Sequence, residues 1–260
     1  MIEPSRVHKD ITALPTFHHL PGIGILTINS FVLHAEQPVI VDTGTSNDRD
    51  KMVAAIIAAC GDTAPSWLWI THTDADHIGS VAPLLEHFPR LKVVTTYTGL
   101  VKMGTHSPVD PRRVRLLNPG ETLDLGDRTI TAMTPPLFDA PETTGFHDPV
   151  SRALFSSDCF GAILPAGTNS INDLGADELL AAQTLWTSID TPWVVKVDRS
   201  LLADELDELR DLAPSMILSA HLPATAAMVD AHLAGIAAAP FAKPFIGHNQ
   251  ATLTQMLQGR

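Results

Sequence analysis

The segment from residue 67 to residue 80 constrains the fold most, because it joins an apolar run to a cluster of side chains that can bind metal. The run 67–70 is typical of a short buried strand. Four candidate ligands follow it within six positions: His72, Asp74, Asp76 and His77. The next run, 81–88, has the amphipathic pattern of a helix. The alternative is a polar loop that only caps this helix, but four ligand types this close together favour a site for zinc, iron or manganese.

The pattern His-x-Asp-x-Asp-His after an apolar strand resembles the signature loop of the metallo-β-lactamase superfamily, whose commoner form is His-x-His-x-Asp-His. A carboxylate at the second ligand position is typical of one branch, the flavodiiron proteins and the related oxygen-binding diiron proteins, which carry glutamate there. The flanking residues 76–80 and 88–94 are also similar to that branch. The resemblance implies an α/β (α+β) fold, the αββα sandwich, in which two sheets face each other, helices lie outside and metals bind at one edge.

The length of the chain fits one large domain or two small ones. A chain of 260 residues, 45% of them apolar, can bury a substantial core. We expect residues 1–260 to form a single metallo-β-lactamase-like domain, with the resemblance strongest over 24–223 and a helical extension over 224–260. Flavodiiron proteins carry a flavodoxin-like domain after this one, and we expect none here. No glycine-rich phosphate loop indicates a flavin site, so electrons would come from a separate redox protein.

Net charge and cysteine content limit the partners and the cellular compartment that we expect for this chain. The net charge of −12 argues against a nucleic-acid or anionic-membrane partner. The first residues contain no apolar signal core, and no run is long enough to span a bilayer. Two cysteines, Cys60 and Cys159, fit a reducing cytoplasm better than a disulfide scaffold. The resemblance adds the expectation of a homodimer.

The remaining pattern alternates strands and helices as the sandwich requires. A β-meander is expected over 23–42, broken at residues 29–30 and 36–38. Further strands are expected at 93–96, 114–117 and 129–133, the last two in the second sheet, and at 216–221. Apolar spacing predicts helices over 48–59, 177–188 and 201–212.

Two further ligands and one neighbouring carboxylate belong to the metal site that the resemblance implies. Asp158, in a Phe-Ser-x-Asp-x-Phe-Gly pattern, corresponds to an aspartate that bridges two metals, which is what a dinuclear site needs because an anion must separate two dications. His221 follows a strand and corresponds to a ligand of the second metal. Asp42, in an Asp-Thr-Gly turn, corresponds to a carboxylate beside the metals that orients an imidazole.

One position departs from the branch. Asp139 stands where the resemblance implies a histidine, so both Asp74 and Asp139 are shorter than the expected ligands of the first metal. Asp139 could still bind directly or through water, His147 could replace the missing imidazole, or the first position could be partly empty. Cys159 is interpreted as a neighbour of the site or as packing, and His248 as either a pocket or a surface residue. Four carboxylates around two ions favour iron, then manganese, over zinc.

Two classes of function follow from this reading. The first is a diiron protein that binds, senses or reduces dioxygen or nitric oxide and receives electrons from a separate protein. The second is a metal-dependent hydrolase of an ester, lactone or phosphodiester. A degenerate member that keeps a single metal is the third alternative. Whether the chain is an enzyme therefore depends on the metal content of the site.

Overall fold

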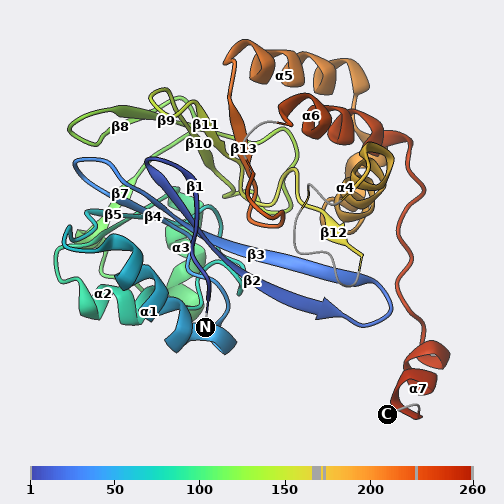
Figure 1. The fold of residues 1–260 in the computed structure, drawn as a ribbon, viewed down its shortest axis with the longest axis horizontal. Coiled ribbons are helices and arrows are strands. Elements are labelled where there is room, and N and C mark those ends of the chain that lie inside the picture. Colours follow the sequence, from blue (N-terminus) through green and yellow to red (C-terminus); the bar gives the residue numbers. More distant parts are fainter. Residues whose placement is uncertain (1, 166–170, 172–173, 226–227, 259–260) are drawn as a thin grey trace.

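Two β-sheets lie face to face with helices on their outer surfaces (Figure 1). The computed structural model describes residues 2–165, 171, 174–225 and 228–258. The αββα sandwich that the resemblance implies is therefore confirmed. Within the described residues, no helix combines the length and the apolar character needed to cross a bilayer.

The first sheet is mixed and follows the chain order. Its strands run β1 (Ser5–His8), β2 (Ile11–Leu20), β3 (Gly24–Leu33), β4 (Val39–Val41), β5 (Trp67–Trp69), β6 (Lys92–Thr95) and β7 (Val114–Leu116), with β12 (Ile163–Leu164) also paired to β3. The pairs from β4 to β7 are parallel. Because parallel strands end at the same edge, the loops after β4 and β5 meet there.

The second sheet supplies the opposite wall of the sandwich. Its order is β13 (Met216–Leu218), β11 (Ala153–Phe155), β10 (Gly145–Asp148), β9 (Thr129–Met133) and β8 (Thr122–Asp124). Strands β11 and β13 are parallel, so the residues that follow both strands emerge side by side. These residues include two of the predicted ligands.

Apolar clusters fill the space between the layers. Between the sheets, Trp69, Phe146 and Phe155 are fully buried, with Phe146 and Phe155 stacked at 4.4 Å between ring centroids. The first sheet is covered by α1 (Arg49–Cys60), α2 (Val81–His87) and α3 (Tyr97–His106). The second is covered by α5 (Arg199–Asp211) and α6 (Val229–Ala238), while α4 (Ala176–Asp190) packs on α6. Burial of these clusters supplies the main driving force for folding.

Several sequence predictions differ from the structure. β3 is continuous through Asn29, where a break was expected, because the Asn29 amide donates to the carbonyls of Ser219 and Leu222 and is thereby satisfied inside the sandwich. β7 pairs with β6 in the first sheet, not in the second as predicted. The strands β1 and β2 and the helix α3 carry no strong periodic signal and were not predicted.

The C-terminal part is helical where the structure describes it. Helix α7 (Gln250–Gln258) lies apart from the sheets, close to the turn between β2 and β3 (Figure 1). Met256 and His248 approach Gly22 in that turn. Residues 226–227 and 259–260 of the predicted extension lie outside the described residues.

Candidate metal centre

The loop after β5 is held against the loop after β4, and this contact sets the direction of the candidate ligands. Thr43 donates from its backbone and its hydroxyl to the His77 carbonyl, at 2.7 and 2.8 Å. Gly79 lies so close to this loop that an added Cβ would come within 2.3 Å of Thr45 and Ser46. Only glycine therefore fits at position 79, two residues after His77.

Asp42 takes a left-handed conformation, with φ of 55°, at the end of β4. Aspartate tolerates this conformation better than most residues. Its carboxylate accepts hydrogen bonds from the Thr71 backbone at 2.9 Å and the Thr71 hydroxyl at 2.8 Å, and lies 2.9 Å from Nδ1 of His77. The conformation thus aims a buried carboxylate at the back of one candidate ligand.

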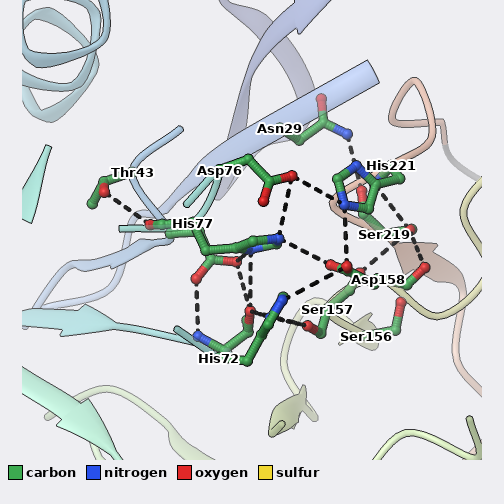
Figure 2. A network of polar contacts seen from close by, with 12 residues as sticks. Asn29, Thr43, His72, Asp76, His77, Ser156, Ser157, Asp158, Ser219 and His221 are labelled. Carbon is green, nitrogen blue, oxygen red and sulfur yellow. Dashed lines mark hydrogen bonds and ion pairs between the residues drawn. The ribbon is translucent and has the colours of Figure 1, made fainter. Parts of the chain in front are cut away.

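The side chains of the metal centre converge from both sheets (Figure 2). Four groups of side chains have potential ligand atoms within 4.8 Å of one another, and three of these groups contain only predicted ligands. The first comprises Asp76, His77 and His221; the second comprises His72, Asp74 and Asp139; the third comprises His72, His77 and Asp158. All seven predicted ligands thus fall in one region. Below, the first group is called the imidazole side and the second the carboxylate side.

Asp158 lies between the two sides. Its carboxylate oxygens are 3.1 Å from Nε2 of His77, 3.2 Å from Nε2 of His221 and 3.7 Å from Nε2 of His72. Its neighbours Ser157 and Phe160 both have positive φ, 54° and 66°, so the loop is held in a sparsely populated conformation. This geometry places one carboxylate in contact with every candidate imidazole.

Each imidazole is oriented by a partner on its other nitrogen. Nδ1 of His77 donates to Asp42, and Nδ1 of His221 donates to the Thr27 carbonyl at 2.9 Å. Nδ1 of His72 hydrogen-bonds the Ser157 hydroxyl at 3.2 Å. These bonds leave the three Nε2 atoms directed at the centre, the arrangement by which proteins fix the tautomer of a metal-binding histidine.

The electrostatics of the centre are those of a cation site. Burial lowers the pKa of His221, but the carboxylates of Asp158 and Asp76 outweigh burial and raise this pKa to about 9. Burial raises the pKa of Asp158, but the surrounding imidazoles hold it well below its usual value. The carboxylates of Asp158 and Asp76 therefore stay ionised, and a bound dication would take the place of the imidazole protons.

The carboxylate side is more open than the imidazole side. His72 is fully buried, whereas Asp74 and Asp139 are exposed. Nε2 of His72 has no hydrogen-bond partner and lies 3.9 Å from Asp139. Partial burial raises the pKa of Asp139, and His72 opposes that rise. The buried Nε2 of His72 thus lies beside the carboxylates of Asp74, Asp139 and Asp158. A cation bound among these groups would give this nitrogen a partner.

The sequence predictions missed one acidic residue at the centre. A carboxylate oxygen of Asp190, the last residue of α4, lies within 4.8 Å of ligand atoms of Asp139 and Asp158. Burial, reinforced by the charges of Asp158 and Asp139, raises the pKa of Asp190 to about 8. A lone aspartate at a helix end carries no motif; the only available signal was an acidic residue in the last helical turn, where the helix dipole disfavours it.

Three other residues considered from the sequence belong to none of the ligand groups among the described residues. His147, on β10, lines a cavity of about 520 Å³ between β9, β10 and α5. His147 belongs to none of the ligand groups among the described residues, so this geometry does not support the alternative in which it replaces the missing imidazole. His248 is exposed beside the β2–β3 turn. Cys159 packs among apolar residues, and burial raises the pKa of its thiol, which disfavours the thiolate that binds metal.

A two-sheet sandwich with histidines and aspartates clustered at one edge defines a metallo-β-lactamase-like protein. More narrowly, the chain belongs to the ODP family of beta lactamases, whose family model matches residues 26–221. The matched range contains all seven predicted ligands.

Individual relatives are similar to about half of this chain. The chain is 26% identical over 140 residues to the rubredoxin-oxygen oxidoreductase of Megalodesulfovibrio gigas, covering 54% of this chain and 35% of the relative. It is 23% identical over 134 residues to the anaerobic nitric oxide reductase flavorubredoxin of Pectobacterium atrosepticum, covering 51% and 26%. The solved rubredoxin oxygen:oxidoreductase of Desulfovibrio gigas superposes with a TM-score of 0.78 at 20% identity, over 92% of this chain and 61% of that one. The matches thus span well under half the length of these two curated relatives.

Proposed function

We propose that this protein holds two iron ions and uses them to reduce dioxygen or nitric oxide with electrons from a separate protein. The observation that carries the proposal is the position of Asp158, whose one carboxylate contacts imidazoles of both sides of the centre. A shared carboxylate is required where two dications lie close together, since it screens their repulsion. A site for one ion would not need it.

Different residues of the chain would orient the ligands of such a centre, cover one side of it and leave an approach for a small ligand. Asp42, the Thr27 carbonyl and Ser157 fix the imidazoles, which leaves little reorganisation for the protein when the centre changes charge. Trp186 packs on His221 with ring centroids 4.5 Å apart and excludes water from the imidazole side. Bound iron ions would supply electrons and coordination positions for a diatomic ligand. The exposed carboxylate side provides the approach for that small ligand.

The donor set supports iron. Carboxylates outnumber imidazoles among the seven candidate ligands, and hard oxygen donors favour iron or manganese over zinc and stabilise higher oxidation states. The names of the two relatives, an oxygen oxidoreductase and a nitric oxide reductase, support the two proposed acceptors. We further propose a homodimer in the cytoplasm, where the two buried free cysteines stay reduced.

Metal content and oxygen reactivity test this function together. The protein is purified without added metal, reconstituted anaerobically with Fe(II), desalted and analysed for elements. The proposal predicts two irons per chain. It also predicts consumption of dioxygen or nitric oxide by the reduced protein, with a reversible change in the visible spectrum.

Hydrolysis is the outcome that would contradict the proposal. Steady turnover of a chromogenic ester or phosphodiester by the zinc-loaded protein, with no oxygen or nitric oxide consumption by the iron-loaded protein, would assign the site to a hydrolase. A single tightly bound metal without either activity would assign it to a degenerate member. The Asp158→Asn variant, which keeps the size of the side chain, should remove whichever activity is observed.

A further inference from the structure

Asp190 lies at the open side of the metal centre but outside the ligand set that the family resemblance implies. One of its carboxylate oxygens comes within 4.8 Å of ligand atoms of Asp139 and Asp158. Asp190 is only partly exposed, whereas Asp139 is exposed. The cluster of three carboxylates thus extends from the surface to the buried bridge between the two sides.

The fold holds Asp190 at this position through contacts on both flanks. Trp186, one helical turn earlier on the same face of α4, donates from Nε1 to the Asp158 carbonyl at 3.0 Å and packs on His221. Trp193, just beyond the helix, contacts Phe138 edge to face with ring centroids 6.0 Å apart. These contacts tie the end of α4 to the two loops that carry Asp158 and Asp139. The approach of the three carboxylates is therefore built into the packing.

The arrangement is unfavourable without a cation. Three carboxylates at this distance cannot all be ionised without strong mutual repulsion, and the C-terminal end of α4 adds partial negative charge. The last turn of α4 contains no basic residue that would compensate. A second feature points to the same ligand: Nε2 of the fully buried His72 has no hydrogen-bond partner and is directed at Asp139 and Asp158. The lone pair of His72 and the three carboxylates are donor types that bind metal ions, and Asp139 and Asp158 are common to both sets of contacts.

We propose that Asp190 is an additional carboxylate ligand on the carboxylate side and compensates there for the imidazole that Asp139 does not supply. The inference rests on the proposed function only in requiring an ion on that side. Asp139 and Asp190 together offer oxygen donors from two different segments, in place of one nitrogen donor. The ion on this side would then be bound almost entirely by oxygen and be harder than its neighbour on the imidazole side.

Metal titration of matched variants tests this assignment. Apoprotein is prepared with a chelator and titrated anaerobically with Fe(II), for the wild type, Asp190→Asn and Asp177→Asn. Asp177 lies exposed in the first turn of the same helix and serves as the control. We expect Asp190→Asn to keep the tighter ion and to weaken the second by at least about tenfold. The control should titrate like the wild type.

Thermal melting separates a ligand from a merely structural residue. If Asp190 binds the ion, Asp190→Asn relieves repulsion in the apoprotein, so the apo Tm stays equal or rises, while the Tm gain on adding Fe(II) shrinks. A structural residue would lower the Tm of both forms. A fall in the apo Tm with unchanged affinity for the second ion would overturn the inference.

The wild-type titration keeps the two proposals apart. Two ions in the wild type with equal second-ion affinity in Asp190→Asn would overturn the role of Asp190 and leave the dinuclear centre standing. Two ions that Asp190→Asn weakens, without any oxygen or nitric oxide chemistry, would support Asp190 and overturn the proposed function. A wild type that binds only one ion would overturn both.

Discussion

The two sides of the metal centre differ in how completely the fold surrounds them. On the imidazole side, His77 and His221 are buried, each with its Nδ1 bonded to a buried oxygen, and Trp186 covers one of the rings. On the carboxylate side only His72 is buried; Asp74 is exposed, and the Asp139 side chain is 21% exposed, close to the 27% of Asp76 on the imidazole side. The same superfamily framework therefore presents one prearranged position and one open position.

The two sides should therefore differ in how tightly they bind a metal ion and in how easily a small molecule reaches that ion. A buried site with oriented imidazoles binds an ion tightly because its ligands need little reorganisation. An exposed site with flexible carboxylates binds more weakly but leaves room for a small molecule. We therefore expect the imidazole side to retain its ion through purification and the carboxylate side to lose its ion first.

Replacement of Asp158 should leave both sides of the centre without metal and so remove the difference in affinity between them. Asp158→Ala deletes the carboxylate that contacts all three imidazoles, so two dications would face each other without a bridge. We expect metal content, measured by elemental analysis after desalting, to fall from about two ions per chain to nearly none. Asp62→Ala, at an exposed position away from the centre, is the control. Retention of one full equivalent would show that one side does not depend on the bridge.

Removal of one histidine should affect the sides unequally. His221→Ala takes an imidazole from the tight side, and we expect the chain to lose the ion that normally survives dialysis, leaving about one weakly held equivalent. The exposed His87→Ala is the matched control. Competition against a chromogenic chelator measures both affinities. If His221→Ala still holds one ion as tightly as the wild type, the assignment of the tight ion to the imidazole side is wrong.

The residues of the metal centre also differ in how far they could be predicted from the sequence. The loop His72–His77 is contiguous, and its strand and following helix were predicted from apolar patterns that packing preserves, so these ligands were located together. Asp158 and His221 were located by resemblance alone, since each is a single residue after a short strand. Asp190 was not predicted because its position depends on the packing of Trp186 and Trp193. These are contacts between segments, and no local sequence pattern encodes them. Asn29 was misread because its partners, Ser219 and Leu222, lie far along the chain.

Asp42→Asn tests whether orientation, rather than ligand identity, makes the imidazole side tight. The asparagine amide oxygen can still accept from Thr71, but its NH₂ group cannot accept from Nδ1 of His77, so the tautomer that directs Nε2 at the ion loses its support. We expect the affinity of the tight ion to fall about 10–100-fold.

The effect of Asp42→Asn should be larger on the imidazole side. Affinity for the weaker ion should change less, because Asp42 reaches His72 only through the Thr71 hydroxyl. Asp62→Asn controls for loss of surface charge. Equal weakening of both ions would mean that Asp42 supports the loop as a whole.

Asp139→His should make the two sides alike, with the smallest expected effect. The exposed position of Asp139 gives the longer side chain room, and an imidazole there would supply the donor that the resemblance implies. We expect about tenfold tighter binding of the second ion, and a shift in preference from iron toward zinc because nitrogen replaces oxygen. Parallel titrations with Fe(II) and Zn(II) measure both quantities. Asp139→Asn, which adds no strong donor, should instead weaken the second ion.

The outcome of Asp139→His also depends on Asp190. If Asp190 already compensates for the missing imidazole, Asp139→His gives a modest gain in the wild-type background and a larger one when combined with Asp190→Asn, because the new imidazole then replaces a ligand that is absent. Equal gains in both backgrounds would mean that the two aspartates act independently. A loss of affinity in both would mean that the carboxylate side is fitted to oxygen donors, and that the open half of the centre has diverged from its relatives through its ligands rather than through its fold.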